Sequence, residues 1–352
     1  MSAAPPAGAA GVRRRGRILS GMRPTGRMHL GNYVGALENW VQLQDEFESF
    51  FMVADWHVLT TAPDKARDIR QNVYDMVLDW LAAGLAPERS PIFVQSHVKE
   101  HAELHLLFSM LVTKARLERN PTLKEQVRDL GMEESLVGYG HLGYPVLQAA
   151  DILLYKGDVV PVGEDQVPHV ELTREIARRF NFLYATEERP VFPEPEARLT
   201  AFARLRGLDS ARMSKTVGNT VWIGEGPETI GKLVRTAYTD PKKIRLVDPG
   251  RPEADPSDNH PGCVVHEYHR KFNPAEADDV AARCRAGQLG CVADKQHLSE
   301  VLAAYLAPIR ERRAEISRDV DRVWDVIADG DRRARAVAEA TMAEVRAAMG
   351  LG

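Results

Sequence analysis

The stretch that most limits the fold is a strand-turn-helix signal near the start of the chain. Residues 17–21 form a short strand-like run, Pro24 and Gly26 mark a turn, and apolar residues recur at helical spacing from about His29. These apolar residues are Leu30, Val34, Leu37, Trp40 and Val41. The N-terminus of the predicted helix therefore faces the end of a strand, where free backbone N–H groups and the helix dipole favour a phosphate.

Three residues in the first turn of this helix have side chains suited to a nucleotide. His29 and Asn32 are three positions apart and share a helix face. Gly31 between them has no side chain, so a flat ring such as adenine could approach the backbone. An ordinary strand-turn-helix with a solvated histidine and asparagine would have the same pattern. This stretch alone leaves both interpretations open.

The same alternation continues along the chain and predicts the fold class. Apolar runs at residues 49–54 and 91–95 read as buried strands, and residues 66–85 between them have helical spacing. Strand, helix, strand, helix, strand at this spacing predicts an α/β fold with a doubly wound parallel sheet. His57 follows the second strand, at the edge where such sheets bind ligands, although a histidine packed under a loop is an equal alternative.

A later apolar helix, predicted at residues 145–155, carries two polar residues on one face, Gln148 and Asp151. A carboxylate among apolar neighbours is costly to bury, so an arginine, a backbone group or a ligand must donate to it. Residues 138–143, just before this helix, match the G-x-G-x-x-G pattern of dinucleotide sites. Because no convincing strand leads into them and Pro145 follows, a glycine-rich approach to the helix is favoured.

Two further polar segments are candidates for nucleotide contacts. Residues 159–162 read as a strand that ends at Gly163, and the acidic pair Glu164 and Asp165 then opens another helix with Gln166. These side chains can accept from a ribose hydroxyl or an ammonium group, or simply cap the helix. Residues 211–219 form a polar loop whose Arg212 and Lys215 suit a phosphate, although any charged surface loop would look similar.

Two segments nearly two hundred residues apart resemble the paired HIGH and KMSKS signatures of class I aminoacyl-tRNA synthetases. They read His29-Leu30-Gly31-Asn32 and Arg212-Met213-Ser214-Lys215-Thr216. The wider form narrows the resemblance to the tryptophanyl-tRNA synthetase family: Ser20-Gly21, then Pro24-Thr25-Gly26-x-x-His29-Leu30-Gly31-Asn32-Tyr33. Tyr144-x-x-x-Gln148-Ala149-Ala150-Asp151 likewise resembles the substrate helix of that family. The sister tyrosine family shares the Gln-x-x-Asp pair, so that pair alone does not separate the two amino acids.

The resemblance implies how the chain is divided. Residues 17–222 are expected to form a Rossmann-like, doubly wound nucleotide-binding domain with a connecting insertion at about 115–140. Residues 223–262 are expected to complete the loop and form a linker, and residues 263–352 an α-helical anticodon-binding domain. Residues 1–16, rich in alanine, proline and glycine and ending in arginines, are read as a disordered tail. A basic face on the C-terminal helices could consist of Lys295, Arg310, Arg312, Arg313, Arg318 and Arg322.

The resemblance also implies the reaction and its residues. L-tryptophan and ATP would give tryptophanyl-adenylate, and the amino acid would then pass to tRNA(Trp), with Mg²⁺ sharing the phosphate charge. The catalytic residues would be His29, Asn32, Arg212 and Lys215. The ATP-binding residues would be Arg23, Pro24, Thr25, Gly31, Asn32, Gly163, Glu164, Asp165, Arg212, Met213, Ser214, Lys215 and Thr216. The tryptophan-binding residues would be Asp151, which accepts from the indole N–H, with Tyr144, Gln148, Gln166 and His57.

Several positions depart from the family pattern. Arg212 and Thr216 stand where lysine and serine are usual, Gln126 where a second lysine is common, and Gln148 where one branch has methionine. Arginine keeps the charge at position 212, and whether these changes alter the rate is open. Two rival functions remain: a small-molecule adenylyltransferase, and a non-catalytic tRNA or protein partner. An Asp151 side chain paired with an internal cation and turned away from the cleft would contradict the tryptophan assignment.

The cysteines and the charge bear on compartment and partners. Cys263, Cys284 and Cys291 resemble an iron–sulfur signature in which Asp294 replaces the fourth cysteine, so a degenerate site with reduced thiols is favoured. An odd cysteine count without a secretion signal indicates the cytoplasm, and no apolar run is long enough for a membrane span. The net charge of −4 argues against wholesale nucleic-acid binding, including DNA, but permits a local tRNA-binding face. A homodimer is implied by the resemblance alone.

Overall fold

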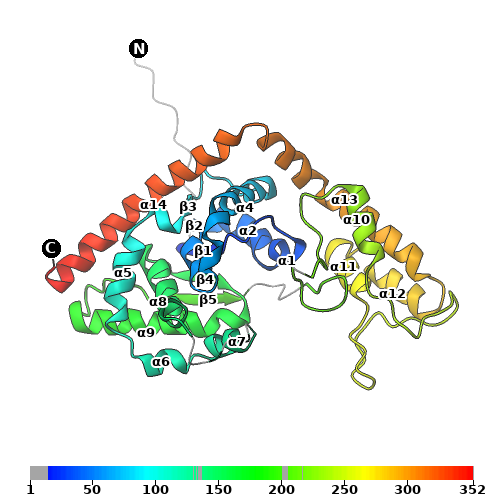
Figure 1. Cartoon of the computed structure of the whole chain (residues 1–352), viewed down its shortest axis with the longest axis horizontal. Coiled ribbons are helices and arrows are strands. Elements are labelled where there is room, and N and C mark those ends of the chain that lie inside the picture. The colour runs from blue at the N-terminus through cyan, green and yellow to red at the C-terminus, as the bar shows by residue number, and fades with distance from the viewer. Residues whose placement is uncertain are drawn as a thin grey trace, which may run out of the picture.

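The computed structural model describes residues 15–129, 131, 133, 137–199, 205–215 and 217–351. Its centre is a five-stranded sheet in the order β3-β2-β1-β4-β5, in which every pairing is parallel (Figure 1). The strands are β1 (Arg17–Met22), β2 (Glu48–Val53), β3 (Ile92–Val94), β4 (Val159–Val162) and β5 (Glu196–Leu199). This order confirms the predicted doubly wound parallel fold. All four residues of β5 are exposed, so the sequence has no apolar run there that predicts a strand.

The sheet is buried on both faces because its strands alternate their side chains between two apolar cores. In β2, Phe51 and Val53 belong to one core with Trp40 and Trp80, while Phe50 and Met52 belong to the other. The first face is covered by α2 (Glu38–Glu46) and α4 (Ile69–Ala83), and the second by α5 (Glu100–Ser109), α8 (Tyr139–Leu154) and α9 (Val167–Tyr184). Two-sided burial explains the continuous apolar runs of the central strands.

The helix predicted to begin near His29 does so, with an irregular first part. α1 (Leu30–Asn32) is capped by His29 and continues through a π-helical turn, η1 (Tyr33–Leu37), into α2. A π-helical turn inside a helix often marks a functional site. β2 is followed by α3 (Asp55–Leu59) and the 3₁₀ helix η2 (Pro63–Asp68) before α4.

One predicted helix boundary is wrong. α8 begins at Tyr139, six residues before the expected start, so Pro145 and the glycines of residues 138–143, apart from the N-cap Gly138, lie inside a helix. That placement excludes the strand-to-helix turn that a dinucleotide site requires, and also the predicted approach loop. Beyond α5, Thr113 caps a separate short helix, α6 (Lys114–Glu118), by accepting from Arg116 N–H.

The other elements complete the connections. They are η3 (Gln95–His97), α7 (Pro121–Asp129) in the predicted insertion, η5 (Glu164–Gln166), α10 (Pro227–Arg235), α11 (Val264–Phe272), α12 (Ala277–Arg285), α13 (Cys291–Ile316) and α14 (Val320–Met349). The helical C-terminal region that the resemblance implies is confirmed by α11 to α14. No helix in the described ranges combines the length and apolarity needed to cross a lipid bilayer.

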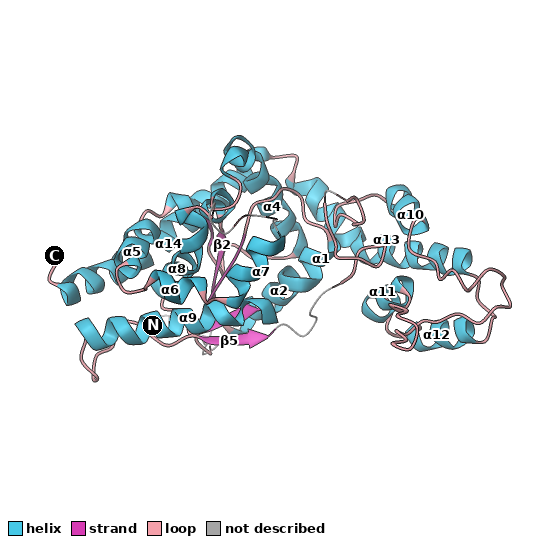
Figure 2. Ribbon diagram, turned by 60° about the horizontal axis from the view of Figure 1, so that its bottom comes forward, coloured by secondary structure: helices cyan, strands magenta, loops and turns pink. Residues whose placement is uncertain are grey.

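The last two helices, α13 and α14, join α10 and α11 to the layers around the sheet. α13 packs against α10 and α11 on one side and α4 on the other, while α14 runs along β3, α5 and α8 (Figures 1 and 2). Ala334, Ala338, Met342 and Val345 of α14 are buried in the second core of the sheet. α14 therefore packs as part of the nucleotide fold, and a domain boundary at residue 263 stays a prediction.

Four members of the proposed basic face are bonded to other parts of the molecule, and the face itself stays a prediction. Arg310 donates to Glu225 O, Arg312 to Ala82 O and Arg313 to the Asp79 carboxylate. All three acceptors lie outside the two C-terminal helices. Lys295 is buried and donates to Ala237 O and Thr239 Oγ1. Helical spacing did not distinguish a solvated cationic face from one that binds the neighbouring layer.

Candidate active site

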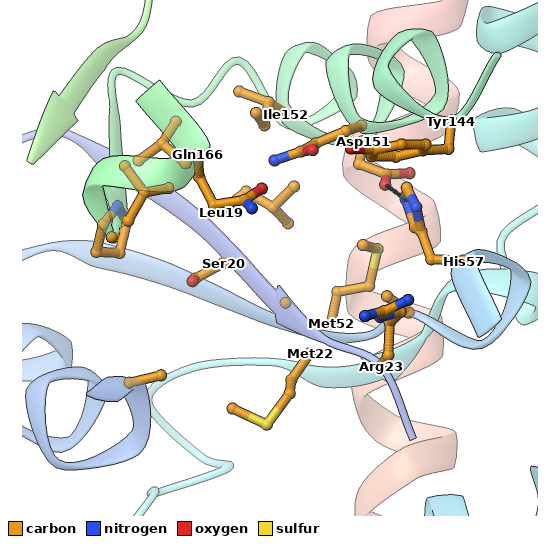
Figure 3. Close-up of a pocket in the computed structure, with 18 of the residues that line it drawn as sticks. Leu19, Ser20, Met22, Arg23, Met52, His57, Tyr144, Asp151, Ile152 and Gln166 are labelled. Atoms are coloured by element: carbon orange, nitrogen blue, oxygen red, sulfur yellow. Dashed lines mark hydrogen bonds and ion pairs between the residues drawn. The ribbon is translucent and has the colours of Figure 1, made fainter. Parts of the chain in front are cut away.

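A cavity of about 350 Å³ opens at the carboxyl ends of β1 and β4, between η1 and α8 (Figure 3). Parallel strands end together there, which is why doubly wound sheets bind ligands at this edge. All five residues predicted to contact tryptophan line the cavity: His57, Tyr144, Gln148, Asp151 and Gln166. The remaining wall is largely apolar, from residues such as Leu19, Met52, Ile152, Val160 and Val162.

Asp151 is the most buried polar group of this wall, with 2% of its surface exposed. Its Oδ1 accepts from Gln95 Nε2 at 2.8 Å and is bonded to His101 Nδ1 at 2.7 Å, while Oδ2 is bonded to His57 Nε2 at 2.7 Å. A carboxylate oxygen can accept two hydrogen bonds. Among the described residues Oδ2 has only the His57 bond, so it has capacity for one more donor from the cavity.

The charge state of Asp151 follows from these bonds. Burial raises the pKa of the Asp151 carboxyl, but the hydrogen bonds from His101 and His57 outweigh burial and hold the pKa below its usual range. The side chain is therefore an ionised acceptor at neutral pH. Its partners are imidazoles and an amide rather than lysine or arginine, and it lines the cavity.

Sequence reasoning missed Gln95 and His101. Gln95 directly follows β3 at the ligand-binding edge, a signal that could have been used. His101 lies in the first turn of α5 and is fully buried, bonded to both Asp151 and Tyr155. Nothing local in the sequence separates His101 from a solvated histidine.

The first signature residues hold each other in a capping arrangement. Asn32 N–H donates to His29 Nδ1 at 3.3 Å, and His29 N–H donates to Asn32 Oδ1 at 3.4 Å. Burial, together with the nearby Lys215 charge, lowers the pKa of His29 to about 4, so the ring is neutral. Because Nδ1 accepts, the single ring proton is on Nε2. Asn32 fixes the orientation of His29, and His29 is left with a donor.

The structure brings the second signature onto the first. Lys215 Nζ donates to Thr25 O, Thr25 Oγ1 and Arg27 O at 2.8, 3.0 and 2.7 Å. A Cβ added at Gly31 would lie 2.8 Å from Met213 Sδ, so the two segments are in close contact at this glycine. Residues almost two hundred positions apart thus form one surface beside the cavity.

The loop that carries Lys215 is built around a residue that the sequence did not single out. Asn219 is buried, accepts from Ser214 N–H at 2.8 Å, and donates to Arg212 O and to Asp209 Oδ1. The loop is therefore tied across its base, and Arg212 is exposed at its rim. A polar asparagine three positions before a tryptophan has no distinctive local pattern.

The predicted ATP-binding residues are only partly in the cavity. Arg23 and Gly163 line it, whereas Glu164 and Asp165 are exposed on η5, and the residues of both signatures lie outside the lining set. Thr216 and the side chain of Gln126 are outside the described residues, as are residues 1–14 of the predicted tail. The cavity therefore brings together the residues predicted to contact tryptophan, while most of those predicted to contact ATP lie outside its lining.

The three cysteines lie together beside a small cavity that Asp294 also lines. Cys263, Cys284 and Cys291 are free and partly buried, and no group of three or more His, Cys, Asp or Glu side chains in the described ranges is arranged to hold a metal ion. Burial raises the pKa of all three thiols, that of Cys284 to about 11. Asp294, which stands at the position of the fourth cysteine, is bonded to His269.

Comparison with known proteins agrees with this geometry. A model of the family "tRNA synthetases class I (W and Y)" matches residues 12–307. The chain belongs to this class of tRNA synthetases. It is 50% identical to the tryptophan–tRNA ligase of Thermotoga maritima and 42% identical to that of Aquifex aeolicus. In each case the match covers 95% of this chain, and 99% and 100% of the relative. Within the class, the chain therefore belongs to the tryptophan–tRNA ligases.

A solved structure has the same architecture over its full length. Tryptophanyl-tRNA synthetase from Campylobacter jejuni, complexed with ADP and tryptophan, superposes with a TM-score of 0.80 at 30% identity. The match covers 95% of this chain and all of that one.

Proposed function

We propose that this protein activates L-tryptophan with ATP and transfers it to tRNA(Trp). The observation that carries the proposal is Asp151, an ionised and buried carboxylate with capacity for one more donor, in a cavity within the usual ~300–1,000 Å³ of ligand pockets. An indole N–H is a donor only and complements such a group. The rival adenylyltransferase would not need this acceptor.

In this reaction the tryptophan carboxylate attacks the α-phosphorus of ATP. The bond from the α-phosphorus to the bridging oxygen breaks, and pyrophosphate leaves with that oxygen. A terminal hydroxyl of the tRNA then attacks the carbonyl of the adenylate, and AMP leaves. Because the substrate is itself the nucleophile, the protein must position the groups and stabilise charge. We assign His29, oriented by Asn32, to the phosphates as a neutral donor, with Lys215 and Arg212 as cations.

Mg²⁺ is implied by the class and would share the charge of the phosphates. Such ions are usually held by substrate phosphates with few protein ligands, so a dedicated protein cage is not required. Assignment to the cytoplasm and to a homodimer also belongs to this proposal.

Exchange of labelled pyrophosphate into ATP tests the function. Exchange should depend on tryptophan, and the protein should then charge tRNA(Trp). Exchange with tyrosine in its place would move the protein to the sister enzymes. Exchange with neither amino acid would favour a non-catalytic binding protein.

The pH dependence of pyrophosphate exchange should show the titration of the Lys215 ammonium group. Burial lowers the pKa of Lys215 to about 8, although the Asp79 carboxylate raises it in part. The ammonium form, which binds phosphate, is present below that pH and is lost as pH rises through it. We expect kcat/KM for ATP to fall above about pH 8, since this parameter reports the free enzyme.

Two variants check the assignment to Lys215. Lys215→Arg should move the fall to higher pH, because a guanidinium stays protonated. Lys215→Ala should lower exchange by about 10²–10³, the effect of removing one charge-stabilising donor. A profile that is unchanged in Lys215→Arg would show that another group titrates.

A further inference from the structure

Asp79 is a buried carboxylate that belongs to neither set of predicted substrate contacts. It lies on α4 among apolar residues such as Leu78 and Trp80, and only 1% of its surface is exposed. Its Oδ1 accepts from Arg313 Nε at 2.6 Å, and its Oδ2 accepts from Met28 N–H at 2.7 Å. A buried carboxylate is costly unless charged or backbone donors satisfy it, so these two bonds hold the side chain in one position.

The backbone amide that Asp79 binds directly precedes the first signature. Met28 O accepts from Ile223 N–H at 3.0 Å, and Leu30 N–H donates to Val221 O at 2.9 Å. Residues 28–30 are therefore paired with residues 221–223, which follow the loop of the second signature. Asp79 adds a side-chain bond at the amide where this pairing begins.

Arg313 reaches Asp79 from α13 and packs against the same paired segment. A Cβ added at Gly224 would lie 2.8 Å from Arg313 Cδ. One turn earlier on α13, Arg310 donates to Glu225 O at 3.2 Å. Helix α13 thus contacts the segment that follows the second signature and, through Asp79, the backbone that leads into the first.

We propose that Asp79, anchored by Arg313, positions His29 for the phosphates of ATP. This inference rests on the proposed function, in which neutral His29 donates to those phosphates. Asn32 fixes the ring of His29, and Asp79 fixes the backbone before it through the Met28 amide. Asp79 and Arg313 are positioning residues here, and His29 is the residue that touches the substrate.

Asp79→Asn is the informative variant because it keeps the size of the side chain but has one acceptor oxygen in place of two. Whichever way the amide is turned, its NH₂ group faces either Arg313 Nε or Met28 N–H, and one bond is replaced by two opposed donors. We expect kcat for tryptophan-dependent exchange to fall about 10–10²-fold, since a displacement of about 1 Å can cost 10²-fold. KM for tryptophan should stay unchanged, because Asp79 is not part of the cavity lining.

A second substitution should restore the arrangement without its charge. In the double variant Asp79→Asn with Arg313→Gln, the glutamine oxygen takes the place of the arginine Nε, because both atoms are one bond beyond Cδ. The asparagine NH₂ can then donate to that oxygen while its own oxygen accepts from Met28 N–H. We expect kcat to return to within about threefold of the native value, as for two coupled neighbours.

This double variant also separates position from charge. The Asp79 carboxylate raises the pKa of Lys215, and the neutral pair leaves that charge absent. Recovery of kcat would therefore assign the effect to position. Recovery of thermal stability without recovery of kcat would overturn the proposal.

A histidine background tests whether Asp79 acts through His29. In His29→Ala, the further change Asp79→Asn should lower exchange by less than about twofold, because no imidazole is left to position. An equal loss in both backgrounds would overturn the proposal, since a structural role does not depend on the imidazole.

Asp75→Asn is the matched control. Asp75 lies one turn earlier on α4, and its Oδ1 is 3.7 Å from Arg313 Nη2, whereas the Met28 amide is bonded to Asp79. This variant removes a charge beside the same arginine and should leave kcat within about twofold of the native value. A loss equal to that of Asp79→Asn would overturn the proposal, because charge near Arg313 would then be sufficient.

Hydrogen exchange of the Met28 amide reads the bond directly, without activity. Its protection should fall about tenfold or more in Asp79→Asn and return in the double variant, the effect of one lost hydrogen bond to a charged group. Unchanged protection would overturn the proposal, as would lost protection with a native kcat. Absence of tryptophan-dependent pyrophosphate exchange in the native protein would instead contradict the proposed function, and the hydrogen-exchange result would stand apart from it.

Discussion

An amino acid with the shape of tryptophan but sulfur in place of the indole N–H should be activated roughly 10⁴-fold less efficiently than tryptophan. Sites built to bond a substrate donor reject analogues without it by about this factor, because the site keeps an unpaired polar group. In this protein that group would be Asp151 Oδ2, which is buried beside apolar side chains and already ionised. The measurement is kcat/KM in pyrophosphate exchange with each amino acid.

A variant at Asp151 tests whether this carboxylate is the group that distinguishes tryptophan from the sulfur analogue. Asp151→Asn keeps the size of the side chain and removes its charge, so tryptophan activation should fall and the preference over the sulfur analogue should shrink to below about 10². Discrimination that stays at 10⁴ in this variant would mean that another group reads the indole nitrogen. Gln148→Met, at the neighbouring position on the same helix, is the matched control and should retain the preference.

Gly330→Ala should strongly destabilise the fold. A Cβ at Gly330 would lie 1.9 Å from Ile92 O and 2.6 Å from Ile92 C, so helix α14 or strand β3 must move. The next residue, Asp331, bonds Val94 N–H at 2.9 Å and His97 Nδ1 at 2.6 Å, and these bonds would be strained by the same movement. We expect a loss of about 3–5 kcal/mol and a fall in Tm of about 10 °C.

Gly231→Ala on α10 is the control for this prediction. Gly231 is also inside a helix, but a Cβ there meets no atom within 4 Å. Alanine should therefore stabilise the protein by about 0.5–1 kcal/mol through helix propensity alone. Thermal unfolding followed by circular dichroism compares the two variants, and equal Tm values would show that α14 does not press on the sheet as described.

The part of the site that sequence reasoning found is the part with local patterns. His29 and Asn32 follow a strand and begin a helix, and Gln148 and Asp151 interrupt an apolar helix at one-face spacing. Each of these arrangements is visible within a dozen residues. The resemblance to known signatures then linked segments that the sequence alone leaves apart, and the fold places them together.

The parts that were missed are polar residues whose meaning depends on distant partners. His101 matters because it is bonded to Asp151, fifty positions away. Arg313 was read as part of a basic face on the C-terminal helices, yet it is bonded to Asp79 across 234 positions. A buried histidine and a solvated one have the same neighbours in sequence, so only packing separates them.

Sequence by itself determined the fold class and the chemistry of the strand ends, because apolar periodicity and turn residues act over short distances. Tertiary structure alone decided which polar groups are paired, where α14 packs, and which ring nitrogen of a buried histidine carries the proton. The physical reason is that burial and hydrogen-bond direction depend on atoms brought together by folding. For Asp151 the two levels agree, since the residue that interrupts an oily helix is the one that three distant side chains hold at the cavity wall.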